Sequence, residues 1–336
     1  MRKLIGKNIL VTGGTGFIGS HLCERLVKLG ANLTILDNSF RSSKRNIESI
    51  LDKVELVEAD VRNFDIIKKS TKDKDIVIHL AAIQGTQNFY DYPDLVLDVG
   101  VTGTLNIVKS VVENKIKHLL VASSSEAYST PQYFPTPETH PLIIPDPANP
   151  RFSYSSTKII SEMLTIHFAK KKGFDYTIFR PHNVYGPRLG WKHIVPEFIK
   201  RIVLNEEFTI QGDGSQTRSF CYIDDGIDQL ILYLTKDKAK NQIFNLGNQK
   251  ESTVNDIIRH LEEICGRKLN PKYVELPAGG TTRRNPDMVK AEQILDYEPK
   301  VGIKEGLKRT YDWYKKEIEY WLKNAKSEEY PWNLRR

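Results

Sequence analysis

The sequence predicts an α/β fold, with a doubly wound parallel sheet followed by a smaller α/β lobe toward the C-terminal end. One observation behind this prediction is that strand and helix patterns alternate from residue 8 to about residue 180, as they do in sheets covered by helices on both faces. The other is a glycine-rich turn between the first strand and the first helix. Such sheets bind ligands at the carboxyl ends of their strands, so the functional site is expected there.

The first unit is a predicted strand, Asn8–Thr12, joined by the glycine turn to a helix at Ser20–Leu29. Gly13, Gly16 and Gly19 have the spacing of a dinucleotide-binding turn of the Rossmann type. The first glycine permits the sharp bend, the second lets the backbone approach a diphosphate, and the third allows close packing of the helix on the strand. The start of the helix would offer free N–H groups to the phosphates.

The second strand, Leu33–Leu36, ends in Asp37 and Asn38, about 20 residues beyond the glycines, where a carboxylate meets the adenosine ribose. Asp37 would accept hydrogen bonds from the ribose hydroxyls and would repel a 2′-phosphate. NAD is therefore favoured over NADP as the cofactor. Arg41 and Lys44 follow closely and could pair with a 2′-phosphate, so the preference is not absolute.

Three later strands also end in small or polar residues, as expected at a ligand-binding edge. Small residues let a cofactor lie against the backbone, whereas His79, inside one of these strands, is expected to be a packed residue. The strands and the residues that follow them are Val54–Ala59 with Asp60 and Val61, Asp75–Leu80 with Ala81 and Ala82, and, after a helix at about Val101–Asn114, Leu119–Ala122 with Ser123 to Glu126.

Tyr154 and Lys158 lie four residues apart in a segment that reads as the start of a helix. Positions i and i+4 share one face of a helix, so the phenol and the ammonium group can point to the same place. A fixed cation favours the phenolate, which can then act as a general base on a sugar or alcohol hydroxyl. This pair occurs by chance on many helices, so its weight comes from the motifs around it.

The chain divides into a predicted dinucleotide-binding domain, residues 1–180, and a substrate lobe, mainly residues 181–336, without a clean linker. A strand at Asp175–Phe179 ends the first domain. The lobe contains a turn-rich loop at Gln211–Arg218. Its other predicted elements are helices at Val195–Leu204, Asp224–Leu234, Val254–Cys265 and Ile303–Leu322 and a short strand at Phe208–Ile210.

The composition of the 336 residues is that of a soluble enzyme. The net charge of +7 is spread along the chain and interleaved with acidic residues, which favours an anionic small substrate over nucleic acid. Cys23, Cys221 and Cys265 lack metal-ligand spacing, so no metal site is predicted and reduced, mostly buried thiols are expected. No apolar run approaches the roughly 18 residues of a membrane span, and no signal-peptide pattern is seen. We expect a cytoplasmic protein that does not bind a membrane.

Together these motifs resemble the extended short-chain dehydrogenase/reductase family, and within it the NAD-dependent nucleotide-sugar epimerases, dehydratases and decarboxylases. The resemblance covers nearly the whole chain. It rests on Thr12 to Gly19, Asp37, Asp60, Leu80 to Ala82, Ser124, Tyr154 with Lys158, Arg180 to Pro187, and Arg218 with Tyr222 to Asp225.

The resemblance implies a role for each of these residues. Tyr154 would deprotonate the sugar C4 hydroxyl, Lys158 would hold the cofactor ribose and lower the pKa of the tyrosine, and Ser124 would bind the same hydroxyl. Hydride would pass from C4 to NAD and leave a 4-keto sugar. The nucleotide sugar would be bound by Ser125, Asn183, Arg218 and Arg284, although Arg283 beside the last of these leaves open that either arginine is a surface charge. The cofactor would be bound by Gly13, Gly16, Phe17, Ile18, Gly19, Asp37, Asn38, Asp60, Val61, Leu80, Ala81, Ala82, Tyr154 and Lys158.

The fate of the keto sugar separates the subclasses of this family. Dehydratases carry an Asp-Glu pair where this chain has Ser125 and Glu126, so the acid that ordinary 4,6-dehydration needs is missing. Decarboxylases of UDP-glucuronate carry a similar Ser-Glu pair. Glu126 is therefore either a base near C5 or a structural carboxylate that accepts backbone hydrogen bonds. Gly100 also departs from the resemblance, because relatives usually have Asn there, near the nicotinamide.

The sequence thus favours an NAD-dependent nucleotide-sugar 4-epimerase, with a UDP-sugar as the preferred substrate. The alternatives are a decarboxylase of the UDP-glucuronate type or a 4,6-dehydratase, and, more remotely, a non-catalytic dinucleotide-sensing protein. Intact Ser124, Tyr154 and Lys158 argue against the last of these. By resemblance, the helices at about Val101–Asn114 and Tyr154–Lys172 would pair with a second subunit in a homodimer. Synthesis of polysaccharide or glycan precursors is the commonest setting of such enzymes.

Overall fold

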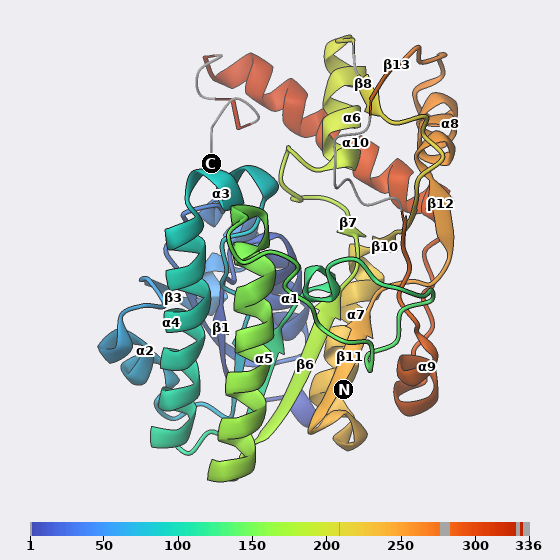
Figure 1. Ribbon diagram of the computed structural model, residues 1–336. Helices are drawn as coiled ribbons and strands as arrows, with labels where there is room; N and C mark the ends of the chain where they lie inside the picture. The colour runs from blue at the N-terminus through green and yellow to red at the C-terminus, as the bar shows by residue number, and fades with distance from the viewer. Residues whose placement is uncertain (1, 208, 276–282, 327–329, 332–336) are drawn as a thin grey trace.

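A seven-stranded parallel sheet forms the centre of the molecule, in the order β11-β6-β5-β4-β1-β2-β3 (Figure 1). The computed structural model describes residues 2–207, 209–275, 283–326 and 330–331. The predicted α/β class with a parallel sheet is confirmed. The strands are β1 (Asn8–Thr12), β2 (Asn32–Asp37), β3 (Val54–Glu58), β4 (Ile76–His79), β5 (His118–Ala122), β6 (Asp175–Pro181) and β11 (Gln242–Leu246).

Both faces of the sheet are buried under helices. In β1, Ile9 and Val11 join one apolar cluster and Leu10 joins another, because successive side chains of a strand point to opposite faces. Figure 1 shows the helices of one face, α4 and α5, side by side in front of the sheet. One cluster takes in α1 (Phe17–Lys28) and α7 (Ile223–Thr235), and the other takes in α2 (Phe64–Thr71), α4 (Pro93–Glu113) and α5 (Ser153–Lys172).

The strand order reverses between β1 and β4, since β2 and β3 extend the sheet to one side of β1 while β4, β5 and β6 extend it to the other. A crevice at such a switch point is where open α/β sheets bind ligands. The glycine turn after β1 and the start of α5, which carries Tyr154, both lie at this carboxyl edge.

Several of the remaining elements, among them α6, α8, α10, β8 and β13, form a smaller group beyond the carboxyl edge of the sheet (Figure 1). The division at residue 180 stays a prediction, and part of the second segment belongs to the main layers, because β11 pairs with β6 and α7 packs on α1. The other elements are α3 (Thr86–Asp91), α6 (Ile194–Leu204), α8 (Val254–Cys265), α9 (Val289–Leu295), α10 (Ile303–Asn324), β7 (Val184–Tyr185), β8 (Thr209–Gln211), β9 (Thr217–Ser219), β10 (Cys221–Tyr222), β12 (Glu251–Thr253), β13 (Lys272–Val274) and β14 (Arg283–Arg284), with 3₁₀ turns η1 (Arg2–Leu4), η2 (Lys44–Lys53), η3 (Ser125–Tyr128), η4 (Pro150–Phe152) and η5 (Asp237–Ala239).

Two helices begin earlier than the sequence patterns predict. α1 starts at Phe17, directly after Gly16, and α4 starts at Pro93 rather than near Val101. Proline suits the first turn of a helix because its missing N–H has no partner there and its φ is already helical. Phe208, predicted to begin a strand, lies outside the described residues, and β8 begins at Thr209.

α4 corrects one prediction from composition. Among the described residues it is the one helix long and apolar enough to meet the length and composition of a membrane span, where the sequence reading expected no such stretch. More than half of its apolar window, 56%, is buried inside the protein. Val96, Ile107 and Val111 pack in the cluster between α4 and the sheet, so the apolar character of α4 serves the core.

Candidate active site

The glycine turn after β1 is built as a tight cradle. Gly13 has φ +73°, and a Cβ there would lie 2.8 Å from the backbone nitrogen of Ala81 at the end of β4. A Cβ at Gly19 would lie 2.1 Å from the carbonyl oxygen of Gly13. No side chain larger than glycine's fits at either position without moving backbone, which agrees with the bend and the close packing expected of these residues.

Asp37, at the end of β2, is held against this turn. Its carboxylate accepts hydrogen bonds from the backbone N–H of Thr15 (3.0 Å) and of Ser39 (2.8 Å). Asn38 donates to Asp60 (3.1 Å), which is also bonded by Arg62. The predicted adenosine-side residues from two neighbouring strands therefore form one connected edge.

This edge fits a dinucleotide. The N-cap of α1 is Gly16, whose lack of a side chain leaves the first N–H groups of the helix without a side-chain cap, as a diphosphate at a helix N-terminus requires. A Cβ at Gly16 would lie 3.2 Å from the Gly13 carbonyl oxygen, so this cradle too favours glycine. Asp37 and the small residues Ala81 and Ala82 border the same edge.

Tyr154 and Lys158 are both buried on the first turns of α5, each with 6% of its surface exposed. The Lys158 ammonium lies 5.4 Å from the centre of the Tyr154 ring and donates a hydrogen bond to the carbonyl oxygen of Ala122 (2.8 Å). Burial lowers the pKa of Lys158 to about 8, although Glu162 opposes this. The predicted i, i+4 pair is thus brought together at the end of β5.

The electrostatics of Tyr154 differ from the expectation that Lys158 lowers its pKa. Burial raises the pKa of Tyr154 above its ordinary value, and the negative charge of Glu126 raises it further, against a hydrogen bond with Ser124. Lys158 is not among the groups that shift it, and its ammonium donates to the Ala122 carbonyl. In the protein without cofactor the phenol is therefore protonated at neutral pH.

Ser124 and Ser125 lie at the junction of β5 and η3. Ser124 caps the 3₁₀ turn, since its hydroxyl oxygen accepts a hydrogen bond from the Glu126 N–H (3.1 Å), and its side chain also bonds Tyr154. Ser125 is buried beside it. The turn thus brings both the Ser124 hydroxyl and the Glu126 carboxylate close enough to act on Tyr154.

Glu126 is held by two arginines. Its carboxylate pairs with Arg151 (2.8 Å) and with Arg284 (2.5 Å). Burial disfavours its charge, but Arg284 and then Arg151 outweigh burial and lower the pKa of the carboxyl to about 2. The expected structural alternative, a carboxylate that accepts backbone hydrogen bonds, is replaced by an ion-paired cluster.

This cluster predicts a specific loss of stability in acid. The carboxyl of Glu126 has a lower pKa in the folded protein, about 2, than the ordinary value of 4.5, so its stabilising contribution is present above pH 4.5 and is lost as the pH falls toward 2. The ionised Glu126 carboxyl contributes about 3 kcal/mol to the free energy of unfolding. In acid-dependent denaturant unfolding, the difference in free energy between wild type and Glu126→Gln should shrink across this window. A constant difference from pH 6 to pH 2 would contradict the pairing.

The predicted substrate residues on the far side also converge. Arg218 of β9 and Arg284 of β14 are register partners on adjacent strands, and the Asn183 amide donates to the carbonyl of Ser219 next to Arg218 (3.4 Å). Arg284 points inward with 12% of its side chain exposed, while Arg283 points outward to Glu251. The surface-charge alternative left open for this pair therefore describes Arg283 and not Arg284.

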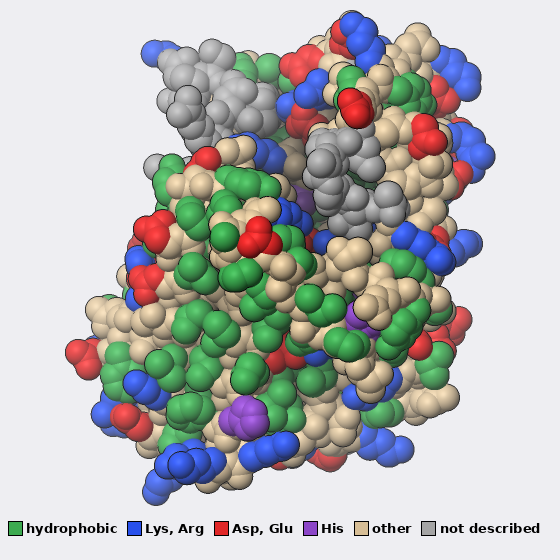
Figure 2. Space-filling view, viewed as in Figure 1, with side chains coloured by type: hydrophobic (Ala, Val, Ile, Leu, Met, Phe, Trp, Pro, Cys, Tyr) green, Lys and Arg blue, Asp and Glu red, His purple; other side chains and the backbone are tan. Residues whose placement is uncertain are grey.

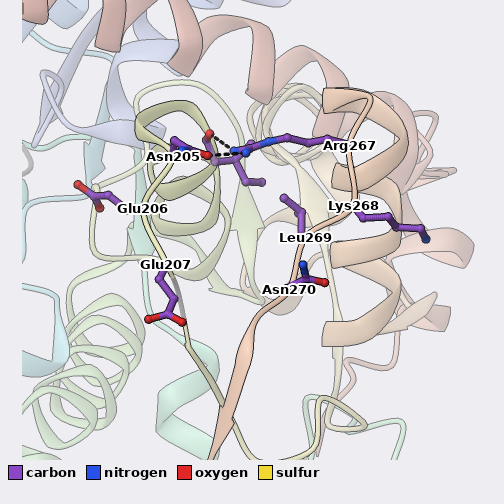
Figure 3. Close-up of a pocket in the computed structure, with 8 residues that line it drawn as sticks. Asn205, Glu206, Glu207, Arg267, Lys268, Leu269 and Asn270 are labelled. Atoms are coloured by element: carbon purple, nitrogen blue, oxygen red, sulfur yellow. Dashed lines mark hydrogen bonds between the residues drawn. The ribbon is translucent and has the colours of Figure 1, made fainter.

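A hollow marks this part of the surface. Figure 2 shows the molecule hollowed between the group of elements that contains α6 and α10 and the ends of α3 and α5, with basic side chains at its edge. By contrast, a pocket of about 160 Å³ lies away from the predicted residues, between the end of α6 and the segment after α8 (Figure 3), where Arg267 bonds Asn205 (2.6 Å). Its lining contains none of the predicted site residues.

Sequence reasoning missed one residue near the site and gave another a different role. Arg151, three positions before Tyr154, reaches back to Glu126, and no prediction rested on it. Arg41, considered from the sequence for a 2′-phosphate, has its guanidinium near Gly85 and acts on Tyr154. The departure at Gly100 has a packing reason, because a Cβ there would lie 2.5 Å from the Thr157 Cβ on α5. The close approach of α4 and α5 leaves no room for Asn.

Comparison with known proteins places these features in context. The model of the NAD dependent epimerase/dehydratase family matches residues 9–247. The chain is 35% identical to a putative UDP-glucose 4-epimerase of Methanocaldococcus jannaschii, covering 91% of this chain and 98% of that protein. It is 31% identical to UDP-glucuronic acid decarboxylase 1 of Xenopus tropicalis, covering 95% and 74%. Its structure is similar to UDP-glucuronic acid 4-epimerase of Bacillus cereus, solved with UDP-glucuronic acid and NAD, with a TM-score of 0.84 at 29% identity over 92% and 99% of the two chains.

Proposed function

The chain belongs to the NAD-dependent epimerase/dehydratase family, and from this premise we propose that it is a 4-epimerase of a UDP-sugar that works through a transient 4-keto intermediate. The observation that carries the proposal is the convergence of Ser124, Tyr154 and Lys158 beside a dinucleotide cradle. A chain that only senses a dinucleotide has no need of this buried trio. The similarity to UDP-sugar epimerases supports the choice of substrate class.

In this proposal the residues divide the work on the sugar C4 hydroxyl. Tyr154 takes its proton, and Ser124, already hydrogen-bonded to the tyrosine, holds the hydroxyl in line. NAD, held by the glycine turn and Asp37, would supply the acceptor and donor of hydride at C4 and the positive charge of its nicotinamide ring. Lys158 adds a second cation near the phenol. Rotation of the keto sugar before hydride returns gives the opposite configuration, and no further acid is needed.

The nucleotide end of the substrate is assigned to the far side of the site. Arg218, Arg284 and Asn183 are the candidates, because two guanidinium groups on adjacent strands suit a diphosphate. Among the residues that the structure describes, the Nε of Arg284 is buried without a hydrogen-bond partner. A buried donor left free in this way is explained by a ligand oxygen that it would meet.

Dehydration fits the site less well than epimerisation. A 4,6-dehydratase needs an acid that protonates the departing hydroxyl, but Ser125 carries no carboxyl group and the pKa of Glu126 is about 2. Glu126 is therefore fully ionised at neutral pH and has no proton to donate.

Decarboxylation of a UDP-hexuronate is the second candidate. Arg151 and Arg284, which both pair with Glu126 near Tyr154, would supply positive charge for a carboxylate on C5 of the sugar. The similarity to UDP-glucuronic acid decarboxylases favours it as well. Once C4 is a ketone, a carboxylate on C5 is activated for loss of CO₂, so the same first step serves both reactions.

Product analysis separates the candidates. The protein is incubated with UDP-, GDP-, CDP- and dTDP-sugars, including UDP-glucuronate, and products are read by mass spectrometry and proton NMR. An isomer of unchanged mass from a UDP-sugar is the expected result. A product lighter by CO₂ from UDP-glucuronate would make the enzyme a decarboxylase, and one lighter by water would make it a dehydratase.

We also propose a homodimer through α4 and α5. Figure 2 shows hydrophobic side chains gathered over these two helices on the viewed face, where Leu97 is 40% exposed and Met163 is 55% exposed. Exposed apolar area of this kind favours a protein partner. Light scattering at micromolar concentration should give twice the mass of the chain, and a monomer would contradict the proposal.

A further inference from the structure

Arg41 lies beside the glycine turn. It follows β2, in a loop whose next residue, Ser42, is hydrogen-bonded through its hydroxyl to the hydroxyl of Thr15 (2.5 Å). The amide of Asn46 donates to the carbonyl oxygen of Thr15 (2.9 Å). These bonds fix the backbone of the Arg41 loop against the residues that form the dinucleotide cradle.

The side chain of Arg41 then crosses toward the centre of the site. A Cβ at Gly85, after β4, would lie 3.4 Å from its Nη2, and a Cβ at Gly190, between β7 and α6, would lie 3.9 Å from the same atom. Its positive charge acts on Tyr154 and on His193. The guanidinium thus lies near Gly85 and Gly190, within electrostatic reach of Tyr154 and His193, while the loop that carries it is tied to the glycine turn.

This guanidinium has no anionic partner in the part of the chain that the structure describes. Its neighbours in sequence are paired, since Lys44 bonds Glu58 (2.6 Å) and Arg45 bonds Glu317 (3.2 Å). The Arg41 side chain keeps an exposed surface. Many protein atoms nevertheless surround its guanidinium, and the resulting desolvation lowers the pKa of the group. A guanidinium that is partly desolvated and has no anionic partner is suited to binding an anionic ligand.

We propose that Arg41 binds the diphosphate of NAD. The glycine turn offers backbone N–H groups to one side of that diphosphate, and the planar guanidinium supplies two more donors and a full positive charge from the other. The position also sets aside the role first considered for Arg41, because its side chain points into the site rather than outward to a 2′-phosphate on the ribose. The inference holds whichever sugar reaction the enzyme catalyses.

The contact has a purpose in this chemistry. The cofactor must stay in place between oxidation and reduction of one sugar, since hydride is returned to the molecule that gave it. A charged, bidentate bond to the diphosphate slows cofactor release without touching the nicotinamide. Gly190 borders the guanidinium closely, so a bound diphosphate would also tie the cofactor to the loop that carries His193.

The test is direct binding of NAD to the full-length protein by calorimetry, with ADP-ribose, adenosine and UDP as further probes. In Arg41→Gln the dissociation constants of NAD and ADP-ribose should rise about tenfold or more, while those of adenosine and UDP stay unchanged. Arg41→Lys should restore part of the affinity, because lysine keeps the positive charge but lacks the planar guanidinium that makes two parallel hydrogen bonds. The affinity of Arg41→Gln for NAD should also depend less on salt than that of wild type.

Lys44→Gln is the matched control, since it removes a cation of the same loop that is already paired with Glu58, and it should bind NAD as wild type does. Unchanged NAD affinity in Arg41→Gln overturns the proposal. If that variant instead loses affinity only for UDP-glucuronate and not for UDP-glucose, the cation serves a sugar carboxylate and the proposal is wrong. Neither outcome depends on which product the enzyme forms.

Discussion

Tyr154→Phe should lower kcat by a factor of about 10² to 10⁴, because it removes the group proposed to take the C4 proton. The fold should be retained, since the ring stacks on Phe89 at 5.1 Å and a phenylalanine ring preserves that contact. The measurement is product formation together with the absorbance of NADH in single-turnover mixtures. Affinity for NAD should remain close to that of wild type, which separates lost chemistry from lost cofactor.

Tyr90→Phe is the control for this variant, because Tyr90 is 51% exposed on α3 and has no contact with the predicted site residues among the described interactions. It should keep full activity.

The wild-type pH profile gives a second check. The pKa of Tyr154 is raised and that of Lys158 is about 8, so activity should rise with pH as the phenolate becomes more populated and then fall above about pH 8 as Lys158 loses its charge. If Tyr154→Phe has the kcat of wild type, Tyr154 is not the base that takes the C4 proton.

Glu162→Gln should reduce the free energy of unfolding by about 3 to 5 kcal/mol, because it leaves the buried charge of Arg180 without its counter-ion. The two side chains are only 3% and 4% exposed, and both carboxylate oxygens are used, by Arg180 (2.7 and 2.8 Å) and by Ser123 (2.5 Å). Arg180 also donates to the Tyr128 hydroxyl (2.8 Å). The network joins α5 to the ends of β5 and β6. Denaturant unfolding measures the loss.

Glu113→Gln provides the contrast, since it breaks an exposed pair between the last residue of α4 and Lys68 of α2 and should cost far less stability than Glu162→Gln. Replacing both partners, as Glu162→Gln with Arg180→Met, should recover part of the stability, because no unpaired charge remains.

Glu162 also raises the pKa of Lys158 one turn away. In Glu162→Gln, the fall in activity at high pH should therefore begin at a lower pH than in wild type. If it begins at the same pH, Glu162 has only a structural role.

The sequence by itself determined the sheet, the glycine turn and the pairing of Tyr154 with Lys158, because each rests on a local pattern. Alternating strand and helix periodicity gave the layers, the spacing of Gly13, Gly16 and Gly19 marked the turn, and four-residue spacing put Tyr154 and Lys158 on one face of a helix. These features depend on backbone geometry over a few residues, which a single sequence records.

The tertiary structure alone decided the electrostatics of the site. Arg284 meets Glu126 across 158 positions of sequence, Arg41 turns inward, and the pKa of Tyr154 rises where a neighbouring lysine suggested a fall. Gly100 likewise has its reason in Thr157 on another helix. Charge pairing and desolvation depend on distance in space and on the surrounding walls, and neither is encoded by spacing along the chain.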